Sequence, residues 1–235
     1  MKIVVATHNE GKLVEIRDIL AEGLGERAQD IELVSAGSLH LPDPVETGTT
    51  FEANALLKAR FVALRTGLPS IADDSGLIVD VMGNAPGILS ARWAGEHGND
   101  EANNRLLLAQ IEDIQDDDRT ARFRCAAALV VPLRDEEDTS DFDADSGMDD
   151  GDGLEDADET VVLGEMPGTI VRAPHGEHGF GYDPIFLPDD QPEEAIASGE
   201  LLTSAQMTPG QKNAISHRGK ALRALVPAVK ALLAD

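Results

Sequence analysis

The chain has 235 residues, of which 42% are hydrophobic and only 3% are aromatic, and its formal net charge is −25. This length can bury a substantial core, but so acidic a chain argues against a general nucleic-acid-binding surface, for which a basic stripe would be expected. Any phosphate group must therefore be held locally, by a few placed cations, backbone amides or a metal ion.

Targeting signals are not evident in the sequence. The N-terminus enters a short apolar segment without a cleavage-site pattern, and no apolar run reaches about 18 residues. The single cysteine, Cys125, cannot form an intramolecular disulfide, and its neighbours are typical of a buried strand. We therefore expect a cytoplasmic protein that neither enters nor crosses a membrane.

The first part of the chain alternates strands and helices. A strand is predicted at residues 3–5, a polar turn at 7–11 and an amphipathic helix at 12–21, followed by a second strand at 31–35. Thr49 and Glu52 have the spacing of a capping box and predict a helix over residues 53–60.

Longer strands are predicted further along the chain. Strands at 70–72 and 77–81 flank a predicted tight turn, Asp73-Asp74-Ser75-Gly76, and an irregular loop at 83–98 leads into a helix at 100–114. A long strand at 122–133, a hairpin at 160–173 turning at Met166-Pro167-Gly168, and a helix at 219–233 that contains Pro227 complete the chain. This order favours an α/β fold with a mixed sheet.

An acidic stretch at residues 135–159 interrupts the pattern. It holds 14 acidic residues, no basic residue and few apolar ones. Because such a segment cannot bury enough surface to offset the entropy of ordering, we expect a disordered, solvated loop between two strands. A role in partner binding or metal buffering is the sharper alternative, and nothing in the sequence favours it.

The polar turn before the first helix is a candidate anion site. Backbone N–H groups and the helix dipole favour a phosphate at such a junction, and Lys12 adds a cation. The turn is not a P-loop, because that pattern needs Gly at position 6 and Ser or Thr at position 13, where this chain has Ala6 and Leu13. These residues alone are equally compatible with a structural turn.

Two adjacent carboxylates, Asp73 and Asp74, form a second candidate site. Their mutual repulsion calls for a compensating cation, and oxygen ligands suit Mg²⁺. Successive residues of a strand face opposite sides, so we expect only one of the two to face a site. An ordinary β-turn is the alternative.

Two further segments carry candidate recognition residues. Gly179-Phe180-Gly181-Tyr182-Asp183-Pro184 can offer a flat ring for base stacking and a carboxylate for a base edge, although a packed turn is also compatible. Ser216-His217-Arg218-Gly219-Lys220, with Lys212 upstream, provides positive charge for a phosphate or a carbonyl oxygen, or else caps the final helix. The remaining histidines show no zinc-site spacing.

Together these segments resemble the inosine triphosphate pyrophosphatase family, also called the XTP/dITP pyrophosphatases. The matching stretches occur in family order along nearly the whole chain: Ala6-Thr7-His8-Asn9-Glu10-Gly11-Lys12, Glu46-Thr47-Gly48-Thr49-Thr50-Phe51-Glu52-Ala53-Asn54-Ala55, Ala72-Asp73-Asp74-Ser75-Gly76-Leu77, Ala85-Pro86-Gly87-Ile88-Leu89-Ser90-Ala91-Arg92, Gly179-Phe180-Gly181-Tyr182-Asp183-Pro184 and Ser216-His217-Arg218-Gly219.

The resemblance implies roles for particular residues. Asp74 is expected to accept a proton from the attacking water, and Glu46 and Asp74 to bind Mg²⁺. The residues expected to contact substrate are Thr7, His8, Asn9, Glu10, Gly11, Lys12, Lys58, Ser75, Phe180, Gly181, Tyr182, Asp183, Lys212, His217 and Arg218, with Arg92 as a further phosphate cation.

The resemblance also implies a fold and an activity. The expected fold is a single domain with a long, curved mixed sheet and two lobes, the nucleotide lying in the cleft between them, usually as a homodimer. The expected reaction is Mg²⁺-dependent hydrolysis of ITP, dITP and XTP to the monophosphate and pyrophosphate. The alternatives are a related pyrophosphatase acting on pyrimidine or modified nucleotides, and a nucleotide-binding regulatory module without turnover.

Overall fold

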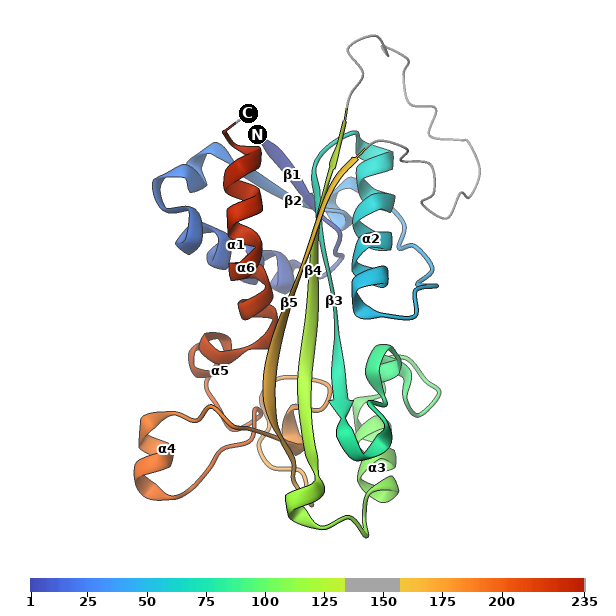
Figure 1. The fold of residues 1–235 in the computed structure, drawn as a ribbon, viewed down its shortest axis with the longest axis vertical. Helices are drawn as coiled ribbons and strands as arrows, with labels where there is room; N and C mark the ends of the chain where they lie inside the picture. Colours follow the sequence, from blue (N-terminus) through green and yellow to red (C-terminus); the bar gives the residue numbers. More distant parts are fainter. Residues whose placement is uncertain (134–156, 235) are drawn as a thin grey trace. The chain divides into compact units, whose positions relative to one another are not determined.

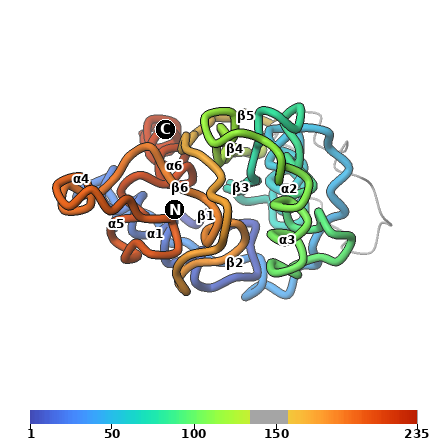
Figure 2. The backbone as a smooth tube through the Cα atoms, turned by 90° about the horizontal axis from the view of Figure 1, so that it is seen from below, coloured from blue at the N-terminus to red at the C-terminus, as the bar shows by residue number. Residues whose placement is uncertain are grey.

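The computed structural model of the protein describes residues 1–133 and 157–234. Figure 1 shows its elements as a ribbon, and Figure 2 traces the same backbone from a second direction. The strands are β1 Lys2–Val5, β2 Glu32–Ser35, β3 Ser70–Val79, β4 Thr120–Pro132, β5 Ala157–Ile170 and β6 Phe186–Pro188. The α-helices are α1 Glu10–Leu24, α2 Phe51–Thr66, α3 Asp100–Gln110, α4 Glu193–Ser198, α5 Pro209–Ile215 and α6 His217–Leu232.

The described strands form a six-stranded sheet in the order β2-β1-β3-β4-β5-β6. β1 pairs in parallel with both β2 and β3, whereas β5 and β6 pair antiparallel. The α/β class and the mixed sheet predicted from the sequence are therefore confirmed.

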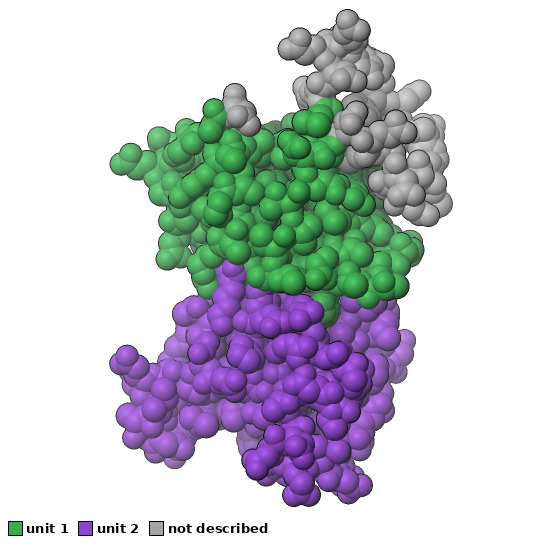
Figure 3. All heavy atoms as spheres, in the orientation of Figure 1, with its two compact units in different colours: residues 1–74, 126–163, 221–235 green, residues 75–125, 164–220 purple. Residues whose placement is uncertain are grey.

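The chain divides into two compact units, which Figure 3 colours separately. Unit 1 comprises Met1–Asp74, Ala126–Leu163 and Ala221–Asp235, and unit 2 comprises Ser75–Cys125 and Gly164–Lys220. The unit boundaries fall within β3, β4, β5 and α6, so each of these elements contributes residues to both units.

Each unit has buried apolar clusters of its own. In unit 1, Val4, Ala36, Phe61 and Val62 form one such cluster. Unit 2 has a larger one, made by Leu77, Val79, Leu107, Ile111, Ala121, Phe123, Met166, Ile170, Tyr182, Ile185 and Phe186. The second cluster draws on strand, helix and loop residues, so it holds the loop that contains Tyr182 against the sheet.

The predicted turn at residues 73–76 is wrong, because β3 runs through it without interruption. The side chains of Asp73 and Asp74 contact different lysines, Lys12 and Lys58. Successive positions of an extended strand point to opposite faces, and each carboxylate has a cation on its own side. No turn is therefore needed to separate the two charges.

The predicted hairpin at 160–173 is also wrong, because β5 is one strand of 14 residues. Pro167 cannot donate a hydrogen bond, but its carbonyl accepts one from the N–H of Asp189 at 3.0 Å, and Gly168 pairs with Pro188 of β6. A proline can remain in a strand where only its carbonyl is used.

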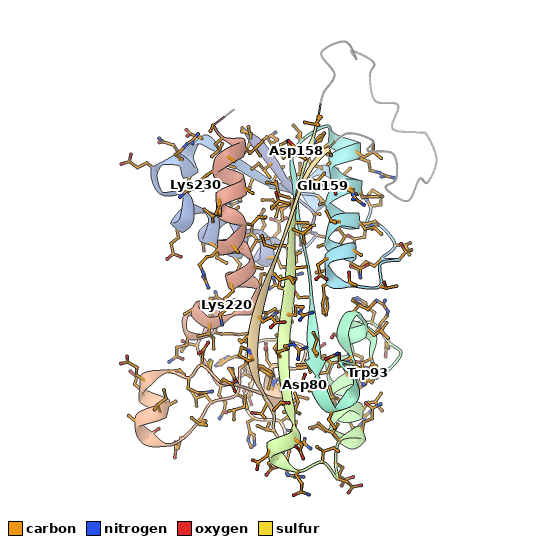
Figure 4. All side chains as sticks on the ribbon, viewed as in Figure 1. Asp80, Trp93, Asp158, Glu159, Lys220 and Lys230 are labelled. Carbon is orange, nitrogen blue, oxygen red and sulfur yellow. The ribbon has the colours of Figure 1, made fainter. Side chains whose placement is uncertain are left out.

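The disordered loop predicted at residues 135–159 includes three residues that belong to β5. Residues 135–156 lie outside the described part of the chain, whereas residues 157–159 begin β5. Glu159, labelled in Figure 4, accepts two hydrogen bonds from the Arg60 guanidinium within unit 1. This bidentate ion pair compensates the charge of Glu159 and stabilises the start of β5, where the acidic segment ends.

Smaller differences concern helix ends and short elements. Thr50 rather than Thr49 caps α2, and its side chain accepts the N–H of Ala53. α3 ends at Gln110, earlier than predicted, and β6, α4 and α5 were not predicted. α6 continues through Pro227, as predicted, and Cys125 is buried in β4 as expected. None of the helices in the described ranges is both long and apolar enough to cross a membrane.

Candidate active site

A lysine lies between two carboxylates in unit 1. Lys58 Nζ is 2.9 Å from Glu46 Oε1 and 2.9 Å from Asp74 Oδ1. Asn54 Nδ2 donates to the other oxygen, Asp74 Oδ2, at 3.3 Å. Asn54 and Lys58 are four residues apart in α2 and therefore share a helix face, which here contacts the end of β3. We call Glu46, Asn54, Lys58 and Asp74 the acidic cluster.

The acidic cluster shifts the pKa values of two of its members. Burial lowers the pKa of Lys58, but the negative charges of Asp74, Asp73 and Glu46 outweigh this and raise it above its ordinary value. Burial raises the pKa of Asp74, and the nearby Lys58 only partly opposes that effect. Asp74 is thus a more basic carboxylate than an exposed aspartate, as a proton acceptor requires.

Asp73 forms a second ion pair in unit 1. Its carboxylate is 3.7 Å from Lys12 Nζ, and the residue is only 7% exposed, whereas about a third of the Lys12 side chain is exposed. Asp73 and Asp74 thus have different lysine partners, and the expectation that only one of them faces a site stays a prediction. Lys12 therefore has a buried anchor and an accessible cationic end.

The N-terminus of α1 is capped by the side chain of its N-cap residue, Asn9. Asn9 Oδ1 accepts the N–H groups of Gly11 and Lys12, at 2.8 and 3.2 Å, and Thr7 Oγ1 accepts the N–H of Asn9 at 3.1 Å. Glu10 accepts a hydrogen bond from Ser35 Oγ. The N–H groups of Gly11 and Lys12 are thus bonded to Asn9, and Lys12 supplies the positive side chain of this turn.

His8 has local partners in the same turn. Its Nε2 lies 2.7 Å from the Leu41 carbonyl and its Nδ1 lies 2.8 Å from Asp43 Oδ1. These contacts tie the turn to the loop that precedes α2. The structure thus assigns His8 an anchoring contact within unit 1.

The oxygen donors of the acidic cluster are of the kind that Mg²⁺ prefers. Within residues 1–133 and 157–234, no group of three or more His, Cys, Asp or Glu side chains could hold a metal ion. Mg²⁺ is usually bound by one or two carboxylates plus phosphate oxygens, and Glu46 and Asp74 supply two. Asn54 Oδ1 is buried without a hydrogen-bond partner in this described part, so the cluster has an unused oxygen acceptor. Oxygen donors and a deficit of positive charge both fit Mg²⁺.

A second polar site lies in unit 2, on residues 179–183, which we call the aromatic loop. Asp183 is 2% exposed, and its Oδ2 accepts the N–H of Phe180 at 2.9 Å and a hydrogen bond from Lys212 Nζ. Lys212 Nζ also lies 4.9 Å from the centroid of the Phe180 ring, which is 64% exposed. The loop therefore presents an open aromatic face beside a donor–acceptor pair.

Gly179 is required by the aromatic loop. Its φ is +79°, and a Cβ at this position would lie 2.1 Å from Asp183 Oδ2. A side chain here would displace the carboxylate that binds Lys212. The glycine pattern of the motif thus reflects close approach as well as backbone conformation.

Tyr182 does not provide the stacking ring expected from the sequence. It is 3% exposed, belongs to the unit 2 core, and its hydroxyl donates to the Ser90 carbonyl at 2.8 Å. Burial, with the charge of Asp100, raises its pKa, so the hydroxyl remains a donor. Phe180 is the exposed ring instead.

The remaining predicted residues lie on β3, α6 and a 3₁₀ helix. His217 begins α6 and stacks on Phe123 with ring centroids 4.9 Å apart, and Arg218 is 7% exposed. Ser75 follows Asp74 in β3, and Arg92 ends a 3₁₀ helix in unit 2. The contacts described above join Glu46, Lys58 and Asp74, and the turn from Thr7 to Lys12, in unit 1, and Phe180, Asp183 and Lys212 in unit 2.

Sequence reasoning missed Asn54 as a member of the acidic cluster. Its spacing of four residues from Lys58 in a predicted helix was the available signal. It also missed Asp100 and Asn104, which contact the aromatic loop from α3. No local pattern marks these two, because they meet the loop only through tertiary structure.

Residues 3–228 match the model of the Ham1 family. The chain is 82% identical to the dITP/XTP pyrophosphatase of Bifidobacterium animalis subsp. lactis, over 99% of this chain and 98% of that protein. It is 67% identical to the dITP/XTP pyrophosphatase of Bifidobacterium longum, over 99% of this chain and 100% of that protein. A solved nucleoside-triphosphatase / dITP/XTP pyrophosphatase from Mycobacterium abscessus is similar at a TM-score of 0.69 and 44% identity, over 97% of this chain and 100% of that one.

Proposed function

Because the chain belongs to the Ham1 family, we propose that it is a dITP/XTP pyrophosphatase, which hydrolyses non-standard purine nucleoside triphosphates to the monophosphate and pyrophosphate. The observation that carries the chemistry is the acidic cluster, in which the partly buried carboxylates of Asp74 and Glu46 share the ammonium group of Lys58. A module that only bound nucleotides would have little need for a partly buried carboxylate of raised pKa.

In the proposed reaction, a water oxygen attacks the α-phosphorus and the bond from this phosphorus to the bridging oxygen of the β-phosphate breaks. Asp74 accepts a proton from the water, and its raised pKa makes it a better base than an exposed aspartate. Lys58 and Lys12 are cations for the phosphate oxygens, and they stabilise the charge that moves onto the departing pyrophosphate. No covalent intermediate is needed.

We assign the Mg²⁺ ligands to Glu46 and Asp74. When bound, Mg²⁺ would neutralise phosphate charge and polarise the phosphorus. Lys58 lies between the same two carboxylates and offsets part of their negative charge. Two carboxylates are a weak site by themselves, and we expect the phosphates of the nucleotide to complete it.

Base selection is proposed to use the aromatic loop with Lys212. Hypoxanthine and xanthine present a carbonyl oxygen at C6 and an N–H at N1, which match the ammonium of Lys212 and the carboxylate of Asp183. Adenine presents the reverse pattern, so its C6 amine would face the Lys212 donor and its N1 acceptor would face the Asp183 carboxylate, and these two groups of the base would be unpaired. An unpaired buried polar group costs about 1–3 kcal/mol, which corresponds to roughly 5- to 150-fold in kcat/KM for each group.

A nucleotide panel tests the proposed function. We expect ITP, dITP and XTP to be hydrolysed with kcat/KM at least about tenfold above that for ATP, and with pyrophosphate rather than orthophosphate as product. Pyrophosphate and orthophosphate should be measured separately for these nucleotides and for dTTP and UTP. A clear preference for a pyrimidine would support the alternative substrate class, and binding of ITP without pyrophosphate release would support a regulatory module.

Metal removal gives a second prediction. Chelation by EDTA is expected to abolish pyrophosphate release, and Mg²⁺ to restore it, because Lys58 alone cannot replace a divalent charge at the phosphates. Calorimetry should show much tighter Mg²⁺ binding with a non-hydrolysable ITP analogue than without nucleotide. Full activity in EDTA, or equally tight Mg²⁺ binding by the free protein, would contradict the assignment.

The homodimer, the cytoplasmic location and the nucleotide cleft between two lobes stay predictions.

A further inference from the structure

One residue of the aromatic loop is held by α3 through both of its backbone groups. The N–H of Gly181 donates to Asp100 Oδ2 at 2.6 Å, and its carbonyl accepts from Asn104 Nδ2 at 2.9 Å. Asp100 and Asn104 are four residues apart, so both project from one face of α3. We call these two residues the α3 clamp.

The α3 clamp contacts the aromatic loop between Phe180 and Asp183, the two residues proposed to recognise the base. Gly181 follows Phe180, the exposed ring, and precedes Asp183 by two residues. Asp183 itself accepts the N–H of Phe180. A shift of the Gly181 peptide would therefore move the ring relative to the carboxylate.

Open space adjoins the aromatic loop on the side of α3. A pocket of about 590 Å³ lies beside it, lined by α3 residues including Asp100, Asn104 and Leu108 and by loop residues including Phe180 and Gly181. Side chains next to open space can shift without losing many contacts, whereas a hydrogen bond to a buried polar group is costly to break. Asn104 is 8% exposed, and its bond to Gly181 is partly buried.

We propose that Asp100 and Asn104 are positioning residues for base selection, acting through the Gly181 backbone rather than by touching the base. This inference rests on the proposed function, in which the aromatic loop recognises the purine. The α3 clamp keeps Phe180 and Asp183 in the geometry that suits the base before it binds. A loop released from the clamp would bind purines more weakly and discriminate among them less.

The test compares Asp100→Ala and Asn104→Ala with Asp100→Asn, which keeps an oxygen acceptor, and with Glu101→Ala. Glu101→Ala is a matched control, because this substitution also removes one acidic side chain from the first turn of α3. Glu101 lines the same pocket, but its side chain is 92% exposed. For each alanine variant of the clamp we expect KM for ITP to rise about 5- to 10-fold with kcat nearly unchanged. The ratio of kcat/KM for ITP to that for ATP should fall, and Asp100→Asn and Glu101→Ala should remain close to the unmodified protein.

A readout independent of turnover is amide hydrogen exchange in residues 178–184, together with the melting temperature. Exchange should be faster in Asp100→Ala and Asn104→Ala than in Glu101→Ala. The inference is overturned if folded clamp variants keep the KM and the ITP-to-ATP ratio of the unmodified protein, or if Glu101→Ala changes them equally. A purely structural role predicts a lower melting temperature with an unchanged ratio, which also overturns it. If the unmodified protein does not discriminate ITP from ATP, the proposed base selection is wrong. That result is distinct from a failure of the α3 clamp, in which the unmodified protein discriminates and the clamp variants do so equally well.

Discussion

Replacing Asp74 by asparagine is expected to lower kcat by about 10²- to 10⁴-fold, because the amide cannot accept a proton from the attacking water. The substitution keeps the shape of the side chain, so Asn54 and Lys58 retain a neighbour of the same size. Nucleotide affinity should change far less, since Lys12 and Lys58 remain. Pyrophosphate release under saturating ITP measures the first effect, and calorimetric titration with ITP measures the second.

Asp80→Asn is the matched control for Asp74→Asn. The Asp80 carboxylate is also hydrogen-bonded, by Thr120 and Arg122, but its side chain is 45% exposed and lies outside the acidic cluster. The kcat of the Asp80→Asn variant should stay close to that of the unmodified protein. An Asp74→Asn variant with a near-normal rate would remove Asp74 from proton transfer, and equal losses of kcat in both variants would indicate a general effect of charge removal.

Replacing Arg119 by methionine is expected to lower the free energy of unfolding by about 3 kcal/mol, through the loss of three hydrogen bonds to buried carbonyls. Arg119 is 2% exposed, and its guanidinium donates to the carbonyls of Ile111, Ile170 and Val171 at 2.6, 2.8 and 3.2 Å. Ile111 is the C-cap of α3, where a positive charge also interacts favourably with the helix dipole. Burial lowers the pKa of Arg119, so the charged form carries a desolvation cost that limits the net loss.

Thermal and urea unfolding measure the effect of Arg119→Met. For a chain of this size, 3 kcal/mol corresponds to a melting temperature about 6–12 °C lower. Arg105→Met is the control, because Arg105 lies on α3, the helix whose C-cap residue Arg119 contacts, with a side chain that is 74% exposed, and a change within about 0.5 kcal/mol is expected there. Equal melting temperatures for the two variants would show that the guanidinium bonds contribute no net stability.

The sequence predicted much of the secondary structure, because the signals involved are local. Apolar spacing marked α1, and short apolar runs marked β1 and β2. The same local reasoning failed at Asp73–Asp74 and at Pro167, where turn-forming residues lie inside β3 and β5. In both places, hydrogen bonds or ion pairs to residues distant in the sequence outweigh local turn propensity.

The candidate site, like the secondary structure, was predicted only in part from the sequence. Ordered motifs identified the family and predicted the chemistry and the main residues, since each motif keeps its residue types at short spacing. The tertiary structure decided how those residues are used: Asn9 caps α1, Tyr182 is buried, and Phe180 is the exposed ring. It also placed Asp100 and Asn104 against Gly181, a contact across 77 to 81 positions of sequence. Residue types and spacing are properties of the sequence, whereas burial and the choice of partner depend on which distant segments pack together, and only the folded chain determines that.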